Sequence, residues 1–163
     1  MNKKTLFITQ AAVIAAIYVV LVLIFQATSY GPIQVRVAEA LTILPYFTPA
    51  AIPGVFLGCF ISNLLAPGTP ILDIIFGSLA TLIAATLSYQ LRRNKYLVVI
   101  PPIVVNALII PWVLRYAYDA PNTIPFLMLT VGIGEIISVG VIGLVLLFSL
   151  DRVKHIIFKP TNH

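Results

Sequence analysis

Three polar residues stand inside stretches of the chain that otherwise carry almost only apolar side chains. Glu135 lies in Gly132-Ile-Gly134-Glu135-Ile-Ile-Ser138, Asn106 precedes Ala-Leu-Ile-Ile, and Asp73 follows closely on Pro70. A charge at the centre of a bilayer costs about 3 kcal/mol on insertion scales, so such groups usually face a bundle interior or a wet cavity. We therefore predict that Glu135, Asn106 and Asp73 accept hydrogen bonds from a ligand. Simpler roles stay open, because Asp73 could cap a helix and Asn106 could bridge two helices.

A second polar group occurs in YGPIQVRVAEALTILPYFTPAAIPG, residues 30–54. Arg36 and Glu39 stand one helical turn apart, which is the spacing of a local ion pair. Alternatively, Arg36 holds Glu39 in place beneath the preceding polar segment, which contains Tyr30 and Gln34. Loops carried by a rigid scaffold often hold binding residues, so we include Tyr30 and Gln34 in the predicted site.

Aromatic and basic side chains occur together in NALIIPWVLRY, residues 106–116. Trp112 and Tyr116 could stack on a flat ligand, and Arg115 lies between them in the sequence. The commoner role for Trp and Tyr near helix ends is an aromatic belt at the membrane interface. We predict Trp112, Arg115 and Tyr116 as ligand neighbours, with the belt as the alternative.

The elements that must position these residues are membrane helices. The chain has 163 residues, of which 60% are hydrophobic and only 9% are charged, whereas ordinary globular chains carry roughly a quarter charged residues. No Asp, Glu, Lys or Arg occurs in residues 5–35, 40–72, 96–114 or 136–150, and a bilayer span needs about 20 mostly apolar residues. The sequence predicts an all-α, multi-pass protein of the cell membrane, in contact with the lipid bilayer.

The prolines and the basic clusters predict how many spans there are. Pro45 and Pro49 break the apolar stretch 37–66 into two short helices. Lys and Arg favour cytoplasmic loops. Six spans, with both termini cytoplasmic, place on one side all three basic clusters, which are Lys3-Lys4, Arg92-Arg93-Lys95 and Arg152-Lys154-Lys159. The net charge of +5 thus indicates orientation rather than nucleic-acid binding. The predicted single domain, 1–163, has spans at about 5–27, 37–47, 50–66, 70–91, 96–117 and 125–150.

This topology places the polar residues on one side of the membrane. Glu39, Asp73, Asn106 and Glu135 all fall in the outer half of their spans, while the inner half has no comparable group. We therefore predict a polar pocket that opens to the outside and is closed toward the cytoplasm.

Small residues recur at four-residue spacing on the first span, as Ala11/Ala15 and Ala12/Ala16. Such rows let helices approach closely in lipid. The pattern fits internal packing, but two adjacent rows are wide for one contact. We predict that Ala11, Ala12, Ala15 and Ala16 dock a partner protein.

The motifs of several enzyme classes are missing from the sequence. It has no H-E-x-x-H, no G-x-S-x-G and no phosphate-binding G-x-x-x-x-G-K-[ST] motif. We expect no catalytic site, no metal site and no bound cofactor, and a binding subunit that takes its energy from a partner. An intramembrane enzyme would show carboxylates at metal-ligand spacing near a membrane face. A homo-oligomeric pore would show polar residues through the full membrane depth.

Residues 30–54, together with NALIIPWVLRY and GIGEIISV, resemble the QueT family over essentially the whole chain. These proteins are substrate-binding S components of energy-coupling factor (ECF) transporters, associated with the uptake of queuosine precursors. The resemblance implies a six-helix bundle with an outward site covered by the first outer loop. It also implies docking through the A-x-x-x-A face of the first helix onto a transmembrane coupling subunit with two ATPase subunits, which bind ATP and Mg. Delivery of the cargo by toppling in the membrane is a further implication.

The polar residues suit such a cargo. A 7-deazaguanine presents adjacent N1–H and 2-amino donors, which a carboxylate can accept in a bidentate manner. On this hypothesis Glu135 binds the guanine-like edge with Asn106, and Asp73 or Glu39 neutralises the amine of 7-aminomethyl-7-deazaguanine. Which carboxylate meets which end of the ligand is left open, and an S component for another vitamin or heterocycle is the alternative.

Overall fold

Helices account for nearly all of the regular structure in the computed structural model, which describes residues 2–26 and 34–158. In chain order they are α1 (Lys3–Ile24), η2 (Val37–Tyr46), α2 (Ala51–Leu65), α3 (Ile71–Gln90), η3 (Leu97–Val99), α4 (Ile100–Ala117), α5 (Ile124–Glu135), η4 (Ile136–Gly143) and α6 (Leu144–Ile157). Helices α5, η4 and α6 follow one another without a break, and η4 is a π-helix. The described ranges contain no strand, so the prediction of an all-helical protein is confirmed.

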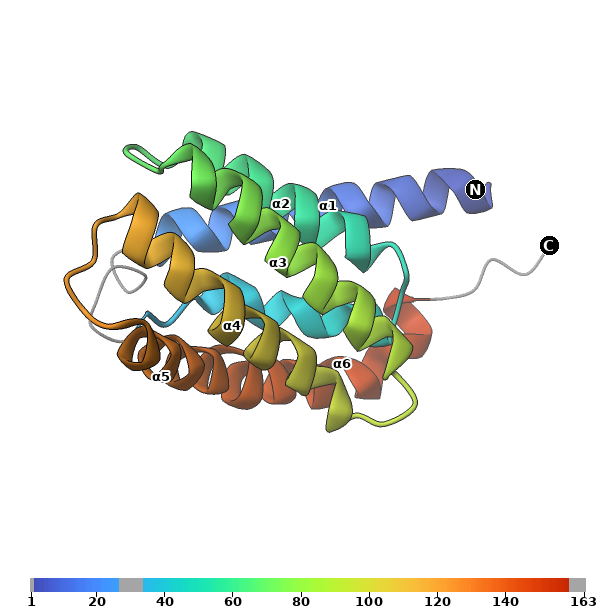
Figure 1. The fold of residues 1–163 in the computed structure, drawn as a ribbon. Coiled ribbons are helices and arrows are strands. Elements are labelled where there is room, and N and C mark those ends of the chain that lie inside the picture. Colours follow the sequence, from blue (N-terminus) through green and yellow to red (C-terminus); the bar gives the residue numbers. More distant parts are fainter. Residues whose placement is uncertain (1, 27–33, 159–163) are drawn as a thin grey trace.

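Successive helices run in alternating directions along the bundle (Figure 1). Helix α1 begins and α6 ends at the same end, where residues 47–50 and 91–96 also make their connections. We call this the basic end, because its described side chains include Lys3, Lys4, Arg92, Arg93, Lys95, Arg152 and Lys154. The connections at 66–70 and 118–123 lie at the opposite end, which we call the cavity end.

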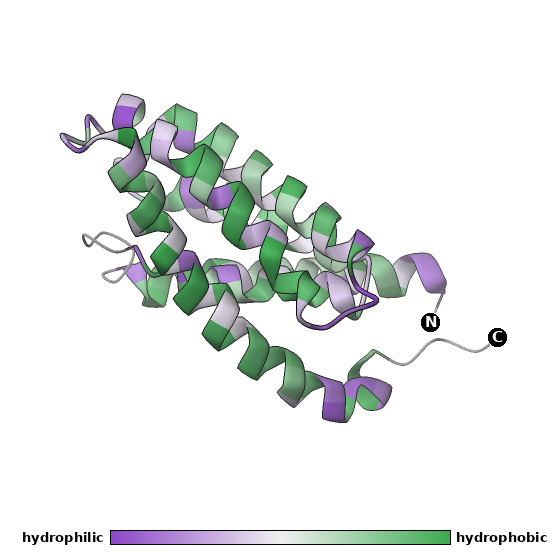
Figure 2. Ribbon diagram, turned by 60° about the horizontal axis from the view of Figure 1, so that its bottom comes forward, coloured by the Kyte–Doolittle hydropathy of each residue, from purple (hydrophilic) through white to green (hydrophobic). Residues whose placement is uncertain are grey.

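Four helical stretches are long and apolar enough to cross a membrane. They are Lys3–Ile24, Ile71–Gln90, Leu97–Ala117 and Ile124–Ile157. Hydrophobic residues cover most of the length of these helices in Figure 2, and many large ones are exposed, as expected for side chains that face lipid. The chain is a multi-pass membrane protein. Six crossings and cytoplasmic termini stay predictions.

Helix η2 forms the centre of the bundle. It is a 3-10 helix rather than the expected short α-helix, and it contacts α1, α2, α3, α6 and η4. Every residue from Ala38 to Pro45 is buried, so no lipid reaches this irregular backbone, as membranes require. Ten residues of 3-10 helix rise about 20 Å, compared with about 15 Å for an α-helix. The apolar core around η2 fills the bundle toward the basic end.

Helices α1 and α2 are in close contact along a row of small residues. A Cβ atom at Gly58 would lie 2.6 Å from the Tyr18 Cβ, and one at Gly54 would lie 3.0 Å from the Ala11 carbonyl oxygen. Ala11 and Ala15 are therefore buried against α2, whereas Ala12 and Ala16 are exposed. Because α2 occupies the row of Ala11 and Ala15, only Ala12 and Ala16 of the four alanines are exposed, and docking of a partner stays a prediction.

This close approach predicts the effect of a single methyl group. We expect Gly58→Ala to lower stability by about 1–3 kcal/mol, the usual cost of overpacking, because Tyr18 is held by the surrounding bundle. Thermal unfolding in detergent measures the effect. Gly140→Ala is the matched control, since its nearest neighbours would lie at ordinary contact distances of 3.7 and 3.9 Å. Equal melting temperatures for both variants would contradict the packing described here.

Candidate functional site

A polar cavity of about 220 Å³ lies between the end of α1, residues 34–38, the end of α2 and the start of α3. Its polar lining consists of Tyr18, Gln26, Gln34, Arg36, Cys59, Ser62, Asn63, Thr69, Asp73 and Tyr118. Gln34, Arg36 and Asp73 are thus brought together as predicted. Glu39, Asn106, Glu135, Trp112, Arg115 and Tyr116 do not line this cavity. Tyr30, also predicted, lies outside the described residues.

Asp73 is the carboxylate of this cavity. It stands in the first turn of α3 and is only 3% exposed. Its Oδ2 accepts a hydrogen bond of 2.6 Å from the Tyr118 hydroxyl, whereas its Oδ1 is buried and accepts none from any described residue. The N-cap residue of α3 is Pro70, and no side-chain cap hydrogen bond is made there. Gly77 leaves the room that the Asp73 side chain needs, because a Cβ there would lie 2.7 Å from Oδ1.

Gln34 lines the same cavity and carries a second unpaired acceptor. Its Oε1 is buried and has no hydrogen-bond partner in the described part of the chain. Its backbone packs directly against α5, where a Cβ at Gly134 would overlap the Gln34 carbonyl oxygen and lie 2.9 Å from the carbonyl carbon. An unpaired buried acceptor costs about 1–3 kcal/mol. Two such acceptors on residues that line one cavity favour a ligand that donates hydrogen bonds.

Arg36 lines the cavity and interacts electrostatically with Asp73, Glu39 and Glu135. It forms no direct ion pair with a carboxylate of the described residues. The local Arg36–Glu39 pair suggested by the spacing is therefore not made. Instead, Arg36 places one positive charge among three carboxylates.

Glu39 belongs to a buried cluster next to the cavity. Its Oε1 accepts hydrogen bonds from the Tyr18 hydroxyl at 2.5 Å and from Thr81 at 3.5 Å. Its Oε2 accepts from the Asn106 amide at 3.5 Å. Asn106 thus joins α4 to η2, which is the bridging role that the sequence left open. Because Tyr18 also lines the cavity, the cluster and the cavity share a side chain.

Glu135 ends α5 and is 2% exposed. Its Oε2 is buried without a hydrogen-bond partner among the described residues, and it interacts electrostatically with Glu39 and Arg36. Asp73 lines the polar cavity and Glu135 does not, so the two carboxylates do not face one cavity. They are related through Arg36, which interacts with both.

Trp112, Arg115 and Tyr116 lie on the surface of α4. Trp112 and Tyr116 stack with ring centres 6.2 Å apart and line an apolar groove between α3 and α4. The Arg115 guanidinium donates a 2.6 Å hydrogen bond to the Ala120 carbonyl oxygen in the following connection. Their exposure favours the role of an aromatic belt with a capped helix end.

Tyr18, Asn63 and Tyr118 are cavity residues that the sequence interpretation missed. Tyr18 is the one tyrosine of α1 and stands three residues after Ala15, so it lies on the same buried face of that helix. This periodicity could have revealed it. Tyr118 follows α4 in a connection, and nothing in the sequence pairs it with Asp73.

The Tyr18–Glu39 bond predicts a stability effect. We expect Tyr18→Phe to destabilise the protein without ligand by about 1–3 kcal/mol, because the buried Glu39 carboxylate loses its shortest donor. Thermal unfolding measures the loss. Tyr116→Phe, at an exposed tyrosine, should change stability by no more than about 0.5 kcal/mol. If Tyr18→Phe left the stability unchanged, the hydrogen bond between Tyr18 and Glu39 would not contribute to the free energy of unfolding.

Comparison with known proteins identifies the family. The chain is 41% identical over 92 residues to a protein of Lactococcus lactis subsp. cremoris (strain MG1363) described as queuosine precursor transporter QueT. The aligned part covers 55% of this chain and 53% of that relative, about half its length. No solved structure matches the chain. A model of the family described as QueT transporter matches residues 8–152, and the chain therefore belongs to the QueT transporter family.

Proposed function

We propose that this protein is the substrate-binding component of an ECF-type importer and captures a queuosine precursor, a 7-deazaguanine such as 7-aminomethyl-7-deazaguanine. The family and the name of the relative support the class of cargo. ATP-driven uptake fits a chain that has no phosphate-binding motif of its own. A coupling subunit and two ATPase subunits would then bind ATP and Mg, and the exposed Ala12 and Ala16 offer the remaining docking row on α1.

The observation that carries the assignment of the site is Asp73, which lines the polar cavity and whose buried Oδ1 has no hydrogen-bond partner among the described residues. The guanine-like edge has two adjacent donors, N1–H and the 2-amino group, and two residues that line the cavity carry unpaired acceptors, Asp73 Oδ1 and Gln34 Oε1. The role first given to Glu135 passes to Asp73 in this proposal. Glu39 and Glu135 act behind the ligand, where Glu39 accepts the Tyr18 hydrogen bond and both interact electrostatically with Arg36.

The size of the cavity bears on the form of the cargo. Pockets for drug-sized ligands measure about 300–1,000 Å³, whereas this cavity measures about 220 Å³. A space of this size favours a free bicyclic base over a nucleoside, which adds a ribose. The proposed ligand is therefore the free base.

Orientation follows from the charges. Lys and Arg favour the cytoplasmic side, so the basic end would face the cytoplasm and the cavity end the outside. The cavity would then receive its ligand from outside, above the apolar core around η2.

Calorimetric titration of the purified protein tests the function. A panel of 7-aminomethyl-7-deazaguanine, the corresponding nucleoside, guanine, riboflavin and biotin separates the candidate cargoes. We expect the deazaguanine base to bind at least tenfold more tightly than any other member. Preference for a vitamin, or no binding of the deazaguanine, would overturn the proposed cargo.

A further inference from the structure

A second pocket, which we call the basic pocket, lies at the basic end. It measures about 500 Å³ and is lined by Tyr46, Phe47, Arg92, Arg93, Lys154, His155 and Phe158. These residues come from the end of η2, the connection after α3 and the end of α6. Its lining therefore combines cationic and aromatic side chains, and none of the described residues that line it carries a carboxylate.

Aromatic rings and a stacked guanidinium shape the basic pocket. Phe47 and Phe158 stack with ring centres 5.0 Å apart and planes 4° apart, and Tyr46 meets Phe47 edge-on at 4.8 Å. The Arg92 guanidinium lies 3.9 Å from the centre of the Tyr89 ring. Stacking of this kind uses the face of a guanidinium and leaves its N–H edge free for an anion.

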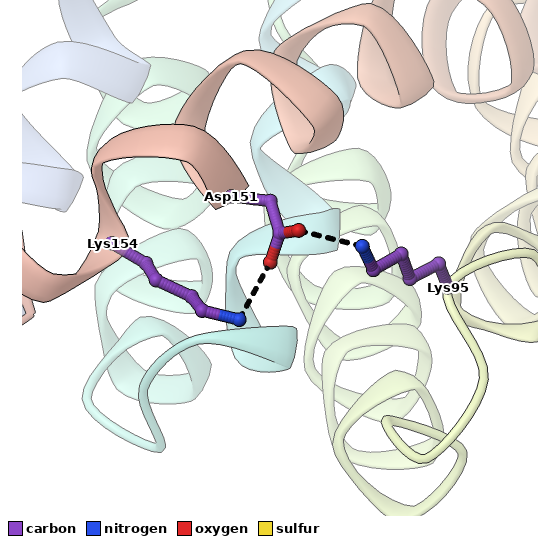
Figure 3. A network of polar contacts seen from close by, with 3 residues as sticks. All are labelled: Lys95, Asp151 and Lys154. Atoms are coloured by element: carbon purple, nitrogen blue, oxygen red, sulfur yellow. Dashed lines mark hydrogen bonds and ion pairs between the residues drawn. The ribbon is translucent and has the colours of Figure 1, made fainter.

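Asp151 holds the two sides of the basic pocket together (Figure 3). Its Oδ2 accepts a 2.6 Å hydrogen bond from Lys95, and its Oδ1 accepts one of 3.0 Å from Lys154. The connection that carries Arg92 and Arg93 is thereby tied to α6. The hydrogen bond to Asp151 also raises the pKa of the Lys95 ammonium above its usual value, so Lys95 stays charged at neutral pH.

Arg92 and Arg93 have no acidic partner among residues 2–26 and 34–158. Asp151 is engaged by two lysines, and neither arginine forms an ion pair with a carboxylate in the described ranges. Glu39, Asp73 and Glu135 lie in the buried cluster or the polar cavity instead. The basic pocket therefore carries an unneutralised positive charge that suits an anion.

The surroundings identify the source of that anion. Exposed apolar residues stand next to the pocket residues in the sequence, with Leu91 before Arg92 and with Val153, Ile156 and Ile157 beside Lys154, His155 and Phe158 on α6. The pocket thus lies where the lipid-facing surface of the bundle ends. A membrane lipid can place its headgroup at this level while its acyl chains follow the apolar residues, and basic pockets between membrane helices bind such headgroups.

We propose that the basic pocket binds the phosphate of an anionic membrane phospholipid. Arg92 and Arg93 donate charge-assisted hydrogen bonds to the phosphate oxygens, and the Phe47–Phe158 pair closes the pocket behind the headgroup. This site is separate from the polar cavity at the other end and does not depend on which cargo the protein carries.

Native mass spectrometry of the full-length protein released from nanodiscs tests the proposal. One set of nanodiscs contains phosphatidylglycerol and phosphatidylcholine in equal amounts. A second set has the same lipids and receives added inorganic phosphate. We expect the unmodified protein to retain phosphatidylglycerol in preference to phosphatidylcholine. The variant Arg92→Gln with Arg93→Gln should lose this preference, with an affinity about fivefold lower for each charge removed.

The matched control is Lys3→Gln with Lys4→Gln, which removes the same charge at the same end but outside the pocket. It should retain phosphatidylglycerol within twofold of the unmodified protein. Arg92→Lys with Arg93→Lys keeps the charge and should keep most of the binding. Equal losses in the Gln variants would reduce the effect to general surface charge and overturn the site. Displacement of the lipid by millimolar inorganic phosphate would also contradict the proposal. So would retention of phosphatidylglycerol that is unchanged in the variant Arg92→Gln with Arg93→Gln. In that case an acidic protein segment would be the better candidate for the occupant of the basic pocket.

Discussion

Asp73→Asn is expected to weaken binding of 7-aminomethyl-7-deazaguanine by at least about 30-fold. The side chain keeps its size but loses the negative charge that attracts the N–H donors of the ligand. Loss of one partner in a buried charged hydrogen bond costs about 2–5 kcal/mol. The amide also brings an N–H group toward the ligand's own donors. Calorimetric titration of the purified variant measures the affinity.

The control for this variant is Asp119→Asn. Asp119 is exposed in the connection after α4, at the same end of the bundle, and its backbone has a φ of 50°, which Asn tolerates. The exchange removes the same charge without touching the cavity, and affinity should stay within twofold. If Asp73→Asn bound the base as tightly as Asp119→Asn does, Asp73 would not contact the ligand.

Gly134→Ala is expected to lower affinity by about 1–3 kcal/mol, or roughly five- to 150-fold. Its new methyl group would overlap the Gln34 carbonyl oxygen, so residues 34–36 must move away from α5. That shift displaces Gln34 Oε1 and Arg36 from the cavity, while the helices themselves keep their contacts. Calorimetry gives the affinity, and circular dichroism checks that the helix content is retained.

Gly132→Ala serves as the control on the same helix. Its Cβ would lie 3.7 Å from the Ala107 Cβ, which is an ordinary contact. Binding by this variant should match the unmodified protein. Should both glycine variants bind normally, the contact between Gln34 and Gly134 would have no part in shaping the site.

The helical architecture was accessible from the sequence because lipid imposes simple rules. Long apolar runs without charge predict spans, and α1, α3 and α4 lie within the ranges expected for them or differ by a few residues. The 3-10 form of η2 was not predictable, since it depends on complete burial by surrounding helices. Likewise, the alanine spacing could not show that α2 presents Gly54 and Gly58 to Ala11 and Ala15.

The site was only partly predictable, for a related reason. A polar residue in an apolar run signals an interior position, and Glu39, Asp73, Asn106 and Glu135 are all buried. Depth along a helix does not say which partner satisfies each group. Asn106 turned out to be bound to Glu39, whereas Asp73, which lines the cavity, has one oxygen without a hydrogen-bond partner among the described residues. That distinction requires the tertiary arrangement of α3, α4 and η2.

A structure of the protein with 7-aminomethyl-7-deazaguanine bound tests the central claim most directly. We predict the base in the polar cavity, with its N1–H or 2-amino group within hydrogen-bond distance of Asp73 Oδ1 and Gln34 Oε1. A base bound in the apolar groove beside Trp112 and Tyr116, or enclosed next to Glu135 with Asp73 still unpaired, would contradict the claim.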